Sequence, residues 1–171
     1  MDFLSLFVLV PMLMLVGFLP CKNIRQIRTV AVIGASMLLA LSIALVCMFL
    51  SERAAGNTAE MLFTFDRLWF PALNIHYSVG VDGISVVMLL LSSVIVFTGV
   101  FASWNMNPLP KEFFMWLTLL SLGVFGFFIS IDLFTMLLFY EVALIPMYLL
   151  IGVWGTGKKE YWPHFYLRCI R

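Results

Sequence analysis

The sequence predicts an all-α polytopic membrane protein with five transmembrane helices and a small β-hairpin on the outer surface. Of its 171 residues, 63% are hydrophobic and 11% are charged, whereas roughly 25% of the residues of a soluble domain are charged. The charges are clustered and leave long uncharged runs, each near the roughly 20 residues that cross a bilayer. These runs predict helices near residues 3–20, 29–50, 82–103, 113–131 and 133–154.

Composition and motifs also exclude several classes of protein. The net charge is +1 and no basic stripe is present, so nothing favours nucleic-acid binding. Cys21, Cys47 and Cys169 lack ligand spacing, which argues against a metal site or a disulfide framework. No catalytic triad or phosphate loop is visible, and an active site within this chain is not expected. Asp2 replaces the basic start of a signal peptide, so we expect the first helix to be retained.

The distribution of Lys and Arg predicts the orientation in the membrane. If the helices alternate in direction, eight basic residues fall on one side, and only Arg53 and Arg67 fall on the other. Basic loops stay on the cytoplasmic side. We therefore expect the N-terminus outside and the loops at 21–28 and 104–112 inside. The expected location is the bacterial inner membrane, or alternatively the mitochondrial inner membrane.

The polar segment 51–79 predicts the hairpin. Residues 73–79 alternate between apolar and polar side chains, which is the period of a strand. Residues 61–65 are a plausible partner across a turn at 66–71, and Trp69, Phe70 and Tyr77 suit the headgroup layer. Small residues at helical spacing predict two packing faces: Ser85, Ser92 and Gly99 on the third helix, and Gly123, Gly126 and Ser130 on the fourth.

Glu141 is the only ionisable residue deep within a predicted span. It lies eight residues past Leu133, about 12 Å into a helix about 30 Å long. A carboxylate at that depth costs roughly 2.5–3.5 kcal/mol, so such residues normally face a bundle interior or an aqueous cavity. We favour a proton-relay role for Glu141. The alternative is a protonated side chain hydrogen-bonded to another helix.

Four residues are candidates for supporting roles. Pro146 has no backbone N–H to donate to the carbonyl of Val142, so that carbonyl could hold a water molecule. An ordinary proline kink in the helix is an equally plausible interpretation. Tyr148, seven residues from Glu141, could extend a hydrogen-bonded chain, but packing or interface anchoring is the safer interpretation. Asp82 and Asp132 precede helices and are expected to cap their free N–H groups, with ion entry a second possibility for Asp82.

Three stretches resemble the antiporter-like membrane subunits of respiratory complex I, and within them the chain M or chain 4 family of NADH-quinone oxidoreductase. They read FDRLWFP at 65–71, VDGIS at 81–85, and FYEVALIPMY at 139–148 followed by GVWG at 152–155. The last motif is the most specific. The resemblance covers about residues 1–160 and corresponds to the N-terminal third of a typical member.

The resemblance implies a fourteen-helix proton-translocating subunit whose Glu141 pairs with a lysine of a later helix. It implies other membrane-arm subunits and the lipid bilayer as partners. It also implies that NADH, FMN, iron–sulfur clusters and quinone are bound by partner subunits, with no redox site or cofactor in this chain. Related cation/proton antiporters and membrane-bound hydrogenases share the glutamate motif.

The expected organisation has three parts: a three-helix region at 1–112, a helical hairpin at 113–157 that begins the channel repeat, and an atypical cytoplasmic tail at 158–171. The tail departs from the family pattern and cannot span a membrane, so we expect a truncated or frame-shifted product. Two other functions stay open: a non-conducting assembly subunit, and a small cation/proton antiporter.

Overall fold

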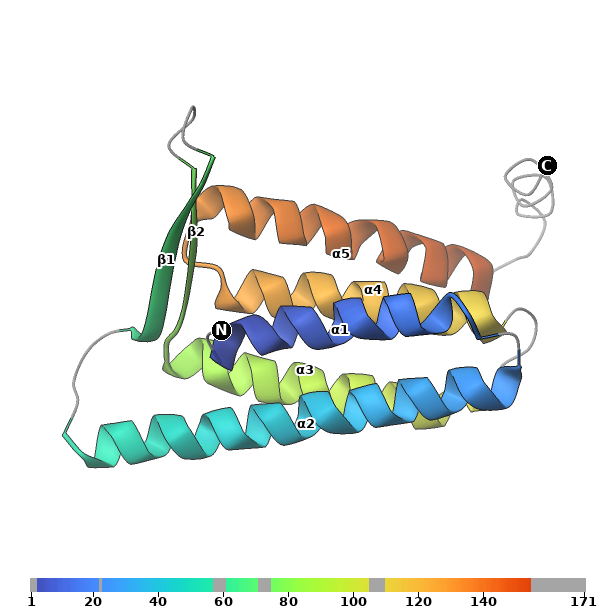
Figure 1. The fold of residues 1–171 in the computed structure, drawn as a ribbon, viewed down its shortest axis with the longest axis horizontal. Coiled ribbons are helices and arrows are strands. Elements are labelled where there is room, and N and C mark those ends of the chain that lie inside the picture. The colour runs from blue at the N-terminus through green and yellow to red at the C-terminus, as the bar shows by residue number, and fades with distance from the viewer. Residues whose placement is uncertain (1–2, 22, 57–60, 71–74, 105–109, 155–171) are drawn as a thin grey trace.

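The computed structural model describes residues 3–21, 23–56, 61–70, 75–104 and 110–154. Its helices lie lengthwise beside one another, and a two-stranded sheet stands across the end where α3 and α5 begin (Figure 1). The elements in chain order are a 3-10 turn at Phe3–Ser5, α1 Leu6–Phe18, α2 Ile24–Ala54, β1 Leu62–Phe70, β2 Ile75–Val81, α3 Gly83–Ala102, α4 Pro110–Ile129 and α5 Leu133–Trp154. The predicted helical membrane fold with a small hairpin is confirmed.

Four of the described helices, α2 to α5, are long and apolar enough to cross a membrane by length and composition. The first differs from its prediction. The α-helix α1 has 13 residues and is about 20 Å long. The 3-10 turn at Phe3–Ser5 precedes it and adds three residues to the helical segment. Helix α1 ends at Phe18, and Pro20, which has no backbone N–H, cannot continue the helical hydrogen bonds.

Helix α2 is longer than its uncharged run, with 31 residues instead of the predicted 22 between 29 and 50. Arg25 and Arg28, which we had expected in a loop, lie in its first turns. Arg25 is exposed, and the Arg28 guanidinium lies over the Trp104 ring with its Nε buried, so the start of this helix accommodates both arginines. The uncharged run therefore predicts the extent of the apolar span, whereas the helix itself continues beyond that run at both ends.

Helix α4 lies at the centre of the bundle. The ring centroids of its Phe125 and of Phe7 on α1 are 5.7 Å apart, and both side chains are fully buried. Helices α2 and α3 meet at a buried hydrogen bond of 2.7 Å between the hydroxyls of Ser42 and Ser93. The core thus combines aromatic packing with small polar contacts.

The predicted packing face on α4 is confirmed. A Cβ at Gly123 would lie 2.7 Å from the backbone nitrogen of Ala143 on α5, and one at Gly126 would overlap the ring of Phe139. The face predicted on α3 is wrong at Gly99, where a Cβ would meet nothing within 4 Å. The serine that packs on α3 is Ser93, one position from the predicted stripe.

The hairpin is longer than predicted. Asp66 to Phe70, which we had placed in the turn, belong to β1, and Asp66 pairs with Ser78. The Ser78 hydroxyl donates to the Asp66 carboxylate at 2.7 Å, which explains how an acidic residue is accommodated in the ladder. The side chains of Trp69, Phe70 and Tyr77 lie outside the described part of the structure.

Strand β2 attaches the hairpin to the helices. The amide of Ile131, in the connection from α4 to α5, donates to the Ser78 carbonyl at 2.9 Å, and Val79 forms a bridge with Ser130. Leu62, Val79 and Val81 are buried. The sheet therefore holds the start of α5 in place.

Candidate functional site

Glu141 lies on the exposed side of α5. Helix α5 contacts α4 along one face, where Thr135 and Pro146 are buried. Pro146 follows Glu141 by five residues, a rotation of about 140° at 100° per residue. The carboxylate of Glu141 therefore points away from α4.

Tyr148 lies on the same face as Glu141. The separation of seven residues corresponds to about 10 Å along the helix and a rotation of about 20°. The residues exposed around the pair are apolar, among them Leu144, Ile145 and Ile151. These two sequence-predicted site residues share an otherwise apolar face of α5, about 10 Å apart along the helix.

Pro146 is separated from this pair. Its ring is buried toward α4, and Val142, whose carbonyl it leaves without a backbone donor, is half-buried. A groove of about 190 Å³ does lie between α4 and α5, and it is lined by Leu120, Val124, Phe127, Phe128, Tyr140, Ala143, Leu144 and Met147. That lining is apolar and does not include Glu141.

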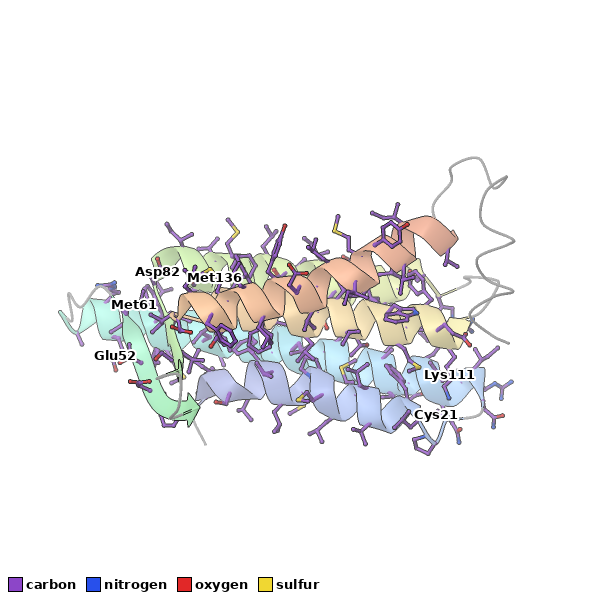
Figure 2. All side chains as sticks on the ribbon, turned by 90° about the horizontal axis from the view of Figure 1, so that it is seen from above. Cys21, Glu52, Met61, Asp82, Lys111 and Met136 are labelled. Carbon is purple, nitrogen blue, oxygen red and sulfur yellow. The ribbon has the colours of Figure 1, made fainter. Side chains whose placement is uncertain are left out.

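Asp132 and Asp82 are caps, as expected. Asp132 accepts from the Thr135 amide at 3.1 Å at the start of α5. Asp82 accepts from the Ser85 amide at 2.7 Å at the start of α3, at the hairpin end of the bundle (Figure 2). The hydrogen bonds from Ser85 lower the pKa of the Asp82 carboxyl below its usual 3.8.

The described basic residues of the helices lie near helix ends and not at the depth of Glu141. Arg25 and Arg28 begin α2, Arg53 ends it, and Lys111 begins α4. Within the described part of the chain, then, no helix offers Glu141 a cation in mid-span. The described residues also contain no group of three or more His, Cys, Asp or Glu side chains that could hold a metal.

The basic residues at the end of the bundle opposite the hairpin have roles that sequence reasoning missed. Lys111 donates to the carbonyls of Cys21 at 3.1 Å and Leu19 at 3.5 Å, and thus joins the start of α4 to the end of α1. The Arg28 guanidinium lies 5.2 Å from the centre of the Trp104 ring. No local pattern reveals such contacts, because the Lys111 partners are about 90 positions away in the chain.

Comparison with known proteins gives a consistent family of relatives. A Picosynechococcus protein named NAD(P)H-quinone oxidoreductase chain 4 3 is 32% identical to this chain over 148 residues. The match covers 86% of this chain and 26% of that protein. The chain is a homologue of these chain 4 proteins. A Synechococcus protein named NAD(P)H-quinone oxidoreductase chain 4 1 is 38% identical over 93 residues, and that match covers 54% of this chain and 18% of the relative.

The chain is also similar to a protein named subunit M of NADH-quinone oxidoreductase. Subunit M of the NADH-quinone oxidoreductase of Rhodobacter capsulatus is 35% identical over 101 residues, or 59% of this chain and 19% of that protein. No family profile matches the chain. The chain 4 homologue spans about a quarter of the length of its first relatives, and the resemblance found in its motifs is confirmed.

Proposed function

We propose that this chain forms part of the membrane arm of a proton-translocating NADH- or NAD(P)H-quinone oxidoreductase, in which Glu141 accepts and releases a proton. The observation that supports this most is the position of Glu141, the mid-span carboxyl group of the described helices, on a face of α5 that the described residues leave uncovered. Placing a carboxyl group at this depth in a bilayer costs roughly 2.5–3.5 kcal/mol. Because packing alone would be served better by an apolar side chain, this cost favours a functional role for Glu141.

The energetic cost of a mid-membrane carboxyl group requires that Glu141 be shielded from lipid in the working protein. A carboxyl group that faced lipid would bear that cost uncompensated, whereas a nearby cation and hydrogen-bond partners would offset it. We infer that a helix outside the described residues, or a neighbouring subunit, covers Glu141 and brings a basic side chain to it. Such a partner would place Glu141 within hydrogen-bond reach of a proton donor or acceptor, which a relay requires.

The other predicted residues take supporting parts in this proposal. Tyr148 lies about 10 Å further along the same face, which is too far for a direct hydrogen bond but within reach through water. Pro146 would contribute through the Val142 carbonyl on the α4 side. Asp132 and Asp82 fix the starts of α5 and α3, and the redox groups would belong to partner subunits.

The proposal extends to orientation. Arg25, Arg28 and Lys111 lie at the end of the bundle where α1 ends and α4 begins, whereas Arg53 lies at the hairpin end. Basic residues favour the cytoplasmic side. We therefore propose that the N-terminus and the hairpin lie outside a bacterial inner membrane.

Replacement of Glu141 by Gln tests the relay. The variant keeps the size and the hydrogen-bonding capacity of the side chain but removes the exchangeable charge, so proton uptake by inverted membrane vesicles oxidising NADH should fall by about tenfold or more. Glu112→Gln, at an exposed position in the first turn of α4, is the matched control and should keep normal uptake. Glu141→Asp should retain part of the activity.

A second candidate function is a non-conducting assembly element. It is favoured by the long apolar face of α5, of whose apolar core only 6% is buried. Under this alternative the Glu141→Gln complex would assemble and pump normally, while apolar-to-polar changes at Leu144 or Ile151 would prevent co-purification with the other subunits. Normal pumping by Glu141→Gln would therefore reject the relay and retain the assembly role.

A further inference from the structure

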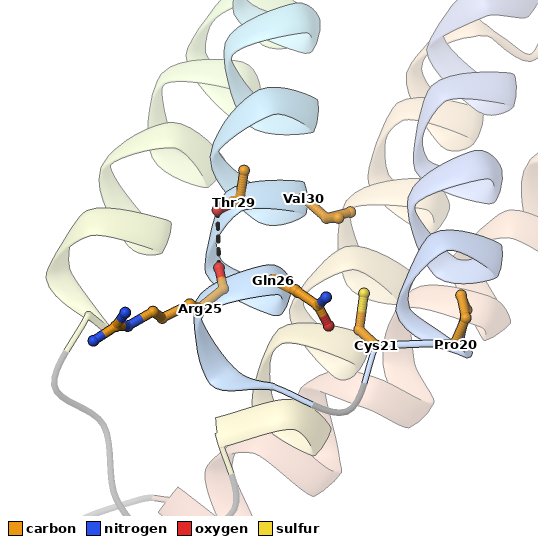
Figure 3. A pocket seen from close by; sticks show the side chains of 6 residues that line it. All are labelled: Pro20, Cys21, Arg25, Gln26, Thr29 and Val30. Atoms are coloured by element: carbon orange, nitrogen blue, oxygen red, sulfur yellow. Dashed lines mark hydrogen bonds between the residues drawn. The ribbon is translucent and has the colours of Figure 1, made fainter.

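Two arginines of α2 lie on the side of that helix where α3 ends. The Arg28 guanidinium lies 5.2 Å from the centre of the Trp104 ring, and Trp104 follows the last residue of α3 by two positions. Figure 3 shows the Arg25 side chain extending away from Pro20 and Cys21 and toward the end of α3. Because residues three apart are neighbours on a helix surface, the two cations share one side of α2.

The described part of the chain does not neutralise the charge of these arginines. Among the described residues, neither arginine has an ion-pair partner, and the Nε atom of Arg28 is buried without a hydrogen-bond acceptor. The Trp104 ring attracts the cation, but it offers no oxygen to the N–H donors of a guanidinium. Like charges at neighbouring helix positions also repel each other. An anion that contacts both guanidinium groups would relieve this repulsion and accept hydrogen bonds from them.

The other charged residues at this end of the bundle do not supply that anion. Lys111 is also basic, and its ammonium group is bonded to the carbonyls of Leu19 and Cys21. Glu112 is the one acidic residue that the structure describes here, and it lies exposed in the first turn of α4. Positive charge is therefore in excess where α2 begins and α3 ends.

The position of Arg28 along α2 corresponds to the depth of lipid headgroups. Arg28 and Arg53 flank the uncharged run at 29–50, and they lie about 37 Å apart along the axis of α2. The hydrocarbon core of a bilayer is about 30 Å thick, and the whole bilayer is about 40–45 Å thick. A helix α2 centred in the membrane therefore places Arg28 just outside the hydrocarbon core, among glycerol and phosphate groups.

A column of aromatic rings leads from Arg28 toward the apolar part of α3. The Phe101 ring is stacked on the Trp104 ring at 6.2 Å between centroids and 9° between planes, and Phe97 lies 4.9 Å from Phe101. Trp104 is 40% exposed and Phe101 is 47% exposed, so both offer ring surface to the membrane. Tryptophan is also typical of the headgroup layer. The guanidinium groups and the rings together match a ligand with an anionic head and a hydrocarbon tail.

We propose that Arg25, Arg28 and Trp104 bind an anionic phospholipid, whose acyl chain lies on the rings of Phe101 and Phe97. Arginine suits this role because its planar group donates parallel N–H bonds to phosphate oxygens and stacks on aromatic rings. The lipid would hold the start of α2 to the end of α3. This site lies on other helices than the carboxyl group of α5 and does not depend on the proposed proton relay.

Lipid retention by charge variants tests this proposal. The full chain, with any subunits that accompany it, is purified in mild detergent and mixed with equal amounts of phosphatidylglycerol and phosphatidylcholine of identical acyl chains. Bound lipid per polypeptide is then counted by mass spectrometry. We expect preferential retention of phosphatidylglycerol. Arg28→Gln should reduce this retention about fivefold, the factor for one cation near an anionic group, and the double variant with Arg25→Gln should reduce it about tenfold or more.

Two further variants serve as controls. Arg28→Lys keeps a cation beside Trp104 and should keep most of the preference for phosphatidylglycerol. Arg53→Gln removes a cation that also lies 5.2 Å from an aromatic ring, that of Phe49, but at the opposite end of α2. Because Glu52 is adjacent to Arg53 in the sequence and already offsets its charge, this variant should leave the preference unchanged. Retention of phosphatidylcholine should be the same in every variant if the fold is kept.

Four results would overturn the proposal. Equal losses in Arg28→Gln and Arg53→Gln would show a general effect of charge, and unchanged retention in the double variant would show that the arginines bind no lipid. Displacement of the lipid by inorganic phosphate at constant ionic strength would identify free phosphate as the ligand. Loss of an accompanying subunit from Arg28→Gln, with lipid retention unchanged, would identify a carboxylate of that subunit as the partner.

Discussion

Helices α4 and α5 are similar in length and apolarity but opposite in their surroundings. Their mean hydropathies over the span are 1.8 and 2.0, yet 44% of the α4 span is buried within the chain and only 6% of the α5 span. Helix α4 contacts α1, α3 and α5, whereas α5 packs on α4 along a single face. Hydrophobicity therefore marks both helices as membrane spans without saying which one is covered by protein.

The polar residues of the two helices follow this difference. Beyond its charged first turn, α4 carries small hydroxyls that bond within their own helix: Thr118 donates to the Phe114 carbonyl, and Ser121 donates to the Thr118 carbonyl. Such self-satisfied groups are compatible with a packed core. Glu141 on α5 is a mid-span carboxyl group on the face that the described helices leave uncovered, so a hydrogen-bond or charge partner for it would come from beyond those helices.

The largest expected effect comes from removing a buried ring of α4. Phe125→Ala takes away a fully buried side chain that contacts Phe7, and should lower the free energy of unfolding by about 3–5 kcal/mol. Phe134→Ala on α5, where the ring is 49% exposed, should change it by less than about 0.5 kcal/mol. Unfolding in SDS mixed micelles measures both, and equal losses would contradict the contrast between the helices.

The contact between the two helices can be broken at a glycine. Gly123→Ala places a methyl group against the backbone of Ala143, which cannot rotate away, so α5 must shift at a cost of about 1–3 kcal/mol. Gly99→Ala is the control, since its methyl group meets nothing within 4 Å and alanine favours the helix. The same unfolding assay should show Gly99→Ala to be neutral or stabilising.

Helix caps provide a smaller and pH-dependent test. Asp82→Ala removes the bond to the Ser85 amide and should cost about 1 kcal/mol at neutral pH. Because the folded-state pKa of Asp82 is lowered from 3.8, its contribution is present above the unfolded-state pKa and is lost as pH falls through the lowered folded-state value. Stability measured from pH 6 to pH 2 should therefore converge for wild type and variant in acid.

The smallest effect is expected at the hydroxyl pair between α2 and α3. A double-mutant cycle of Ser42→Ala and Ser93→Ala should give a coupling energy of about 0.6 kcal/mol, the average for hydrogen bonds between membrane helices. The same cycle applied to Ser36 and Thr98, which bond only within their own helices, should show none. A coupling near zero for Ser42 and Ser93 would mean that their contact contributes nothing to packing.

Local sequence patterns were sufficient for several features. The helical spans, the β-hairpin, the caps at Asp82 and Asp132, and the small-residue contact of α4 each follow from residues close together in the chain. The exact ends were less predictable: α2 extends past its uncharged run, with Arg28 and Arg53 lying over the rings of Trp104 and Phe49, and β1 continues through Asp66, to which Ser78 bonds. These extensions depend on contacts and not on composition.

The sequence by itself determined that the chain is built of apolar helices, that Glu141 lies in mid-span, and that Tyr148 shares its face, because these are consequences of helical period and residue hydrophobicity. Only the tertiary structure decided that α4 is central and α5 peripheral, that Lys111 joins α4 to the end of α1, and that α4 covers the Pro146 face of α5 and not the Glu141 face. The physical reason is that burial depends on which helices are neighbours, and neighbours are set by contacts between residues far apart in the chain.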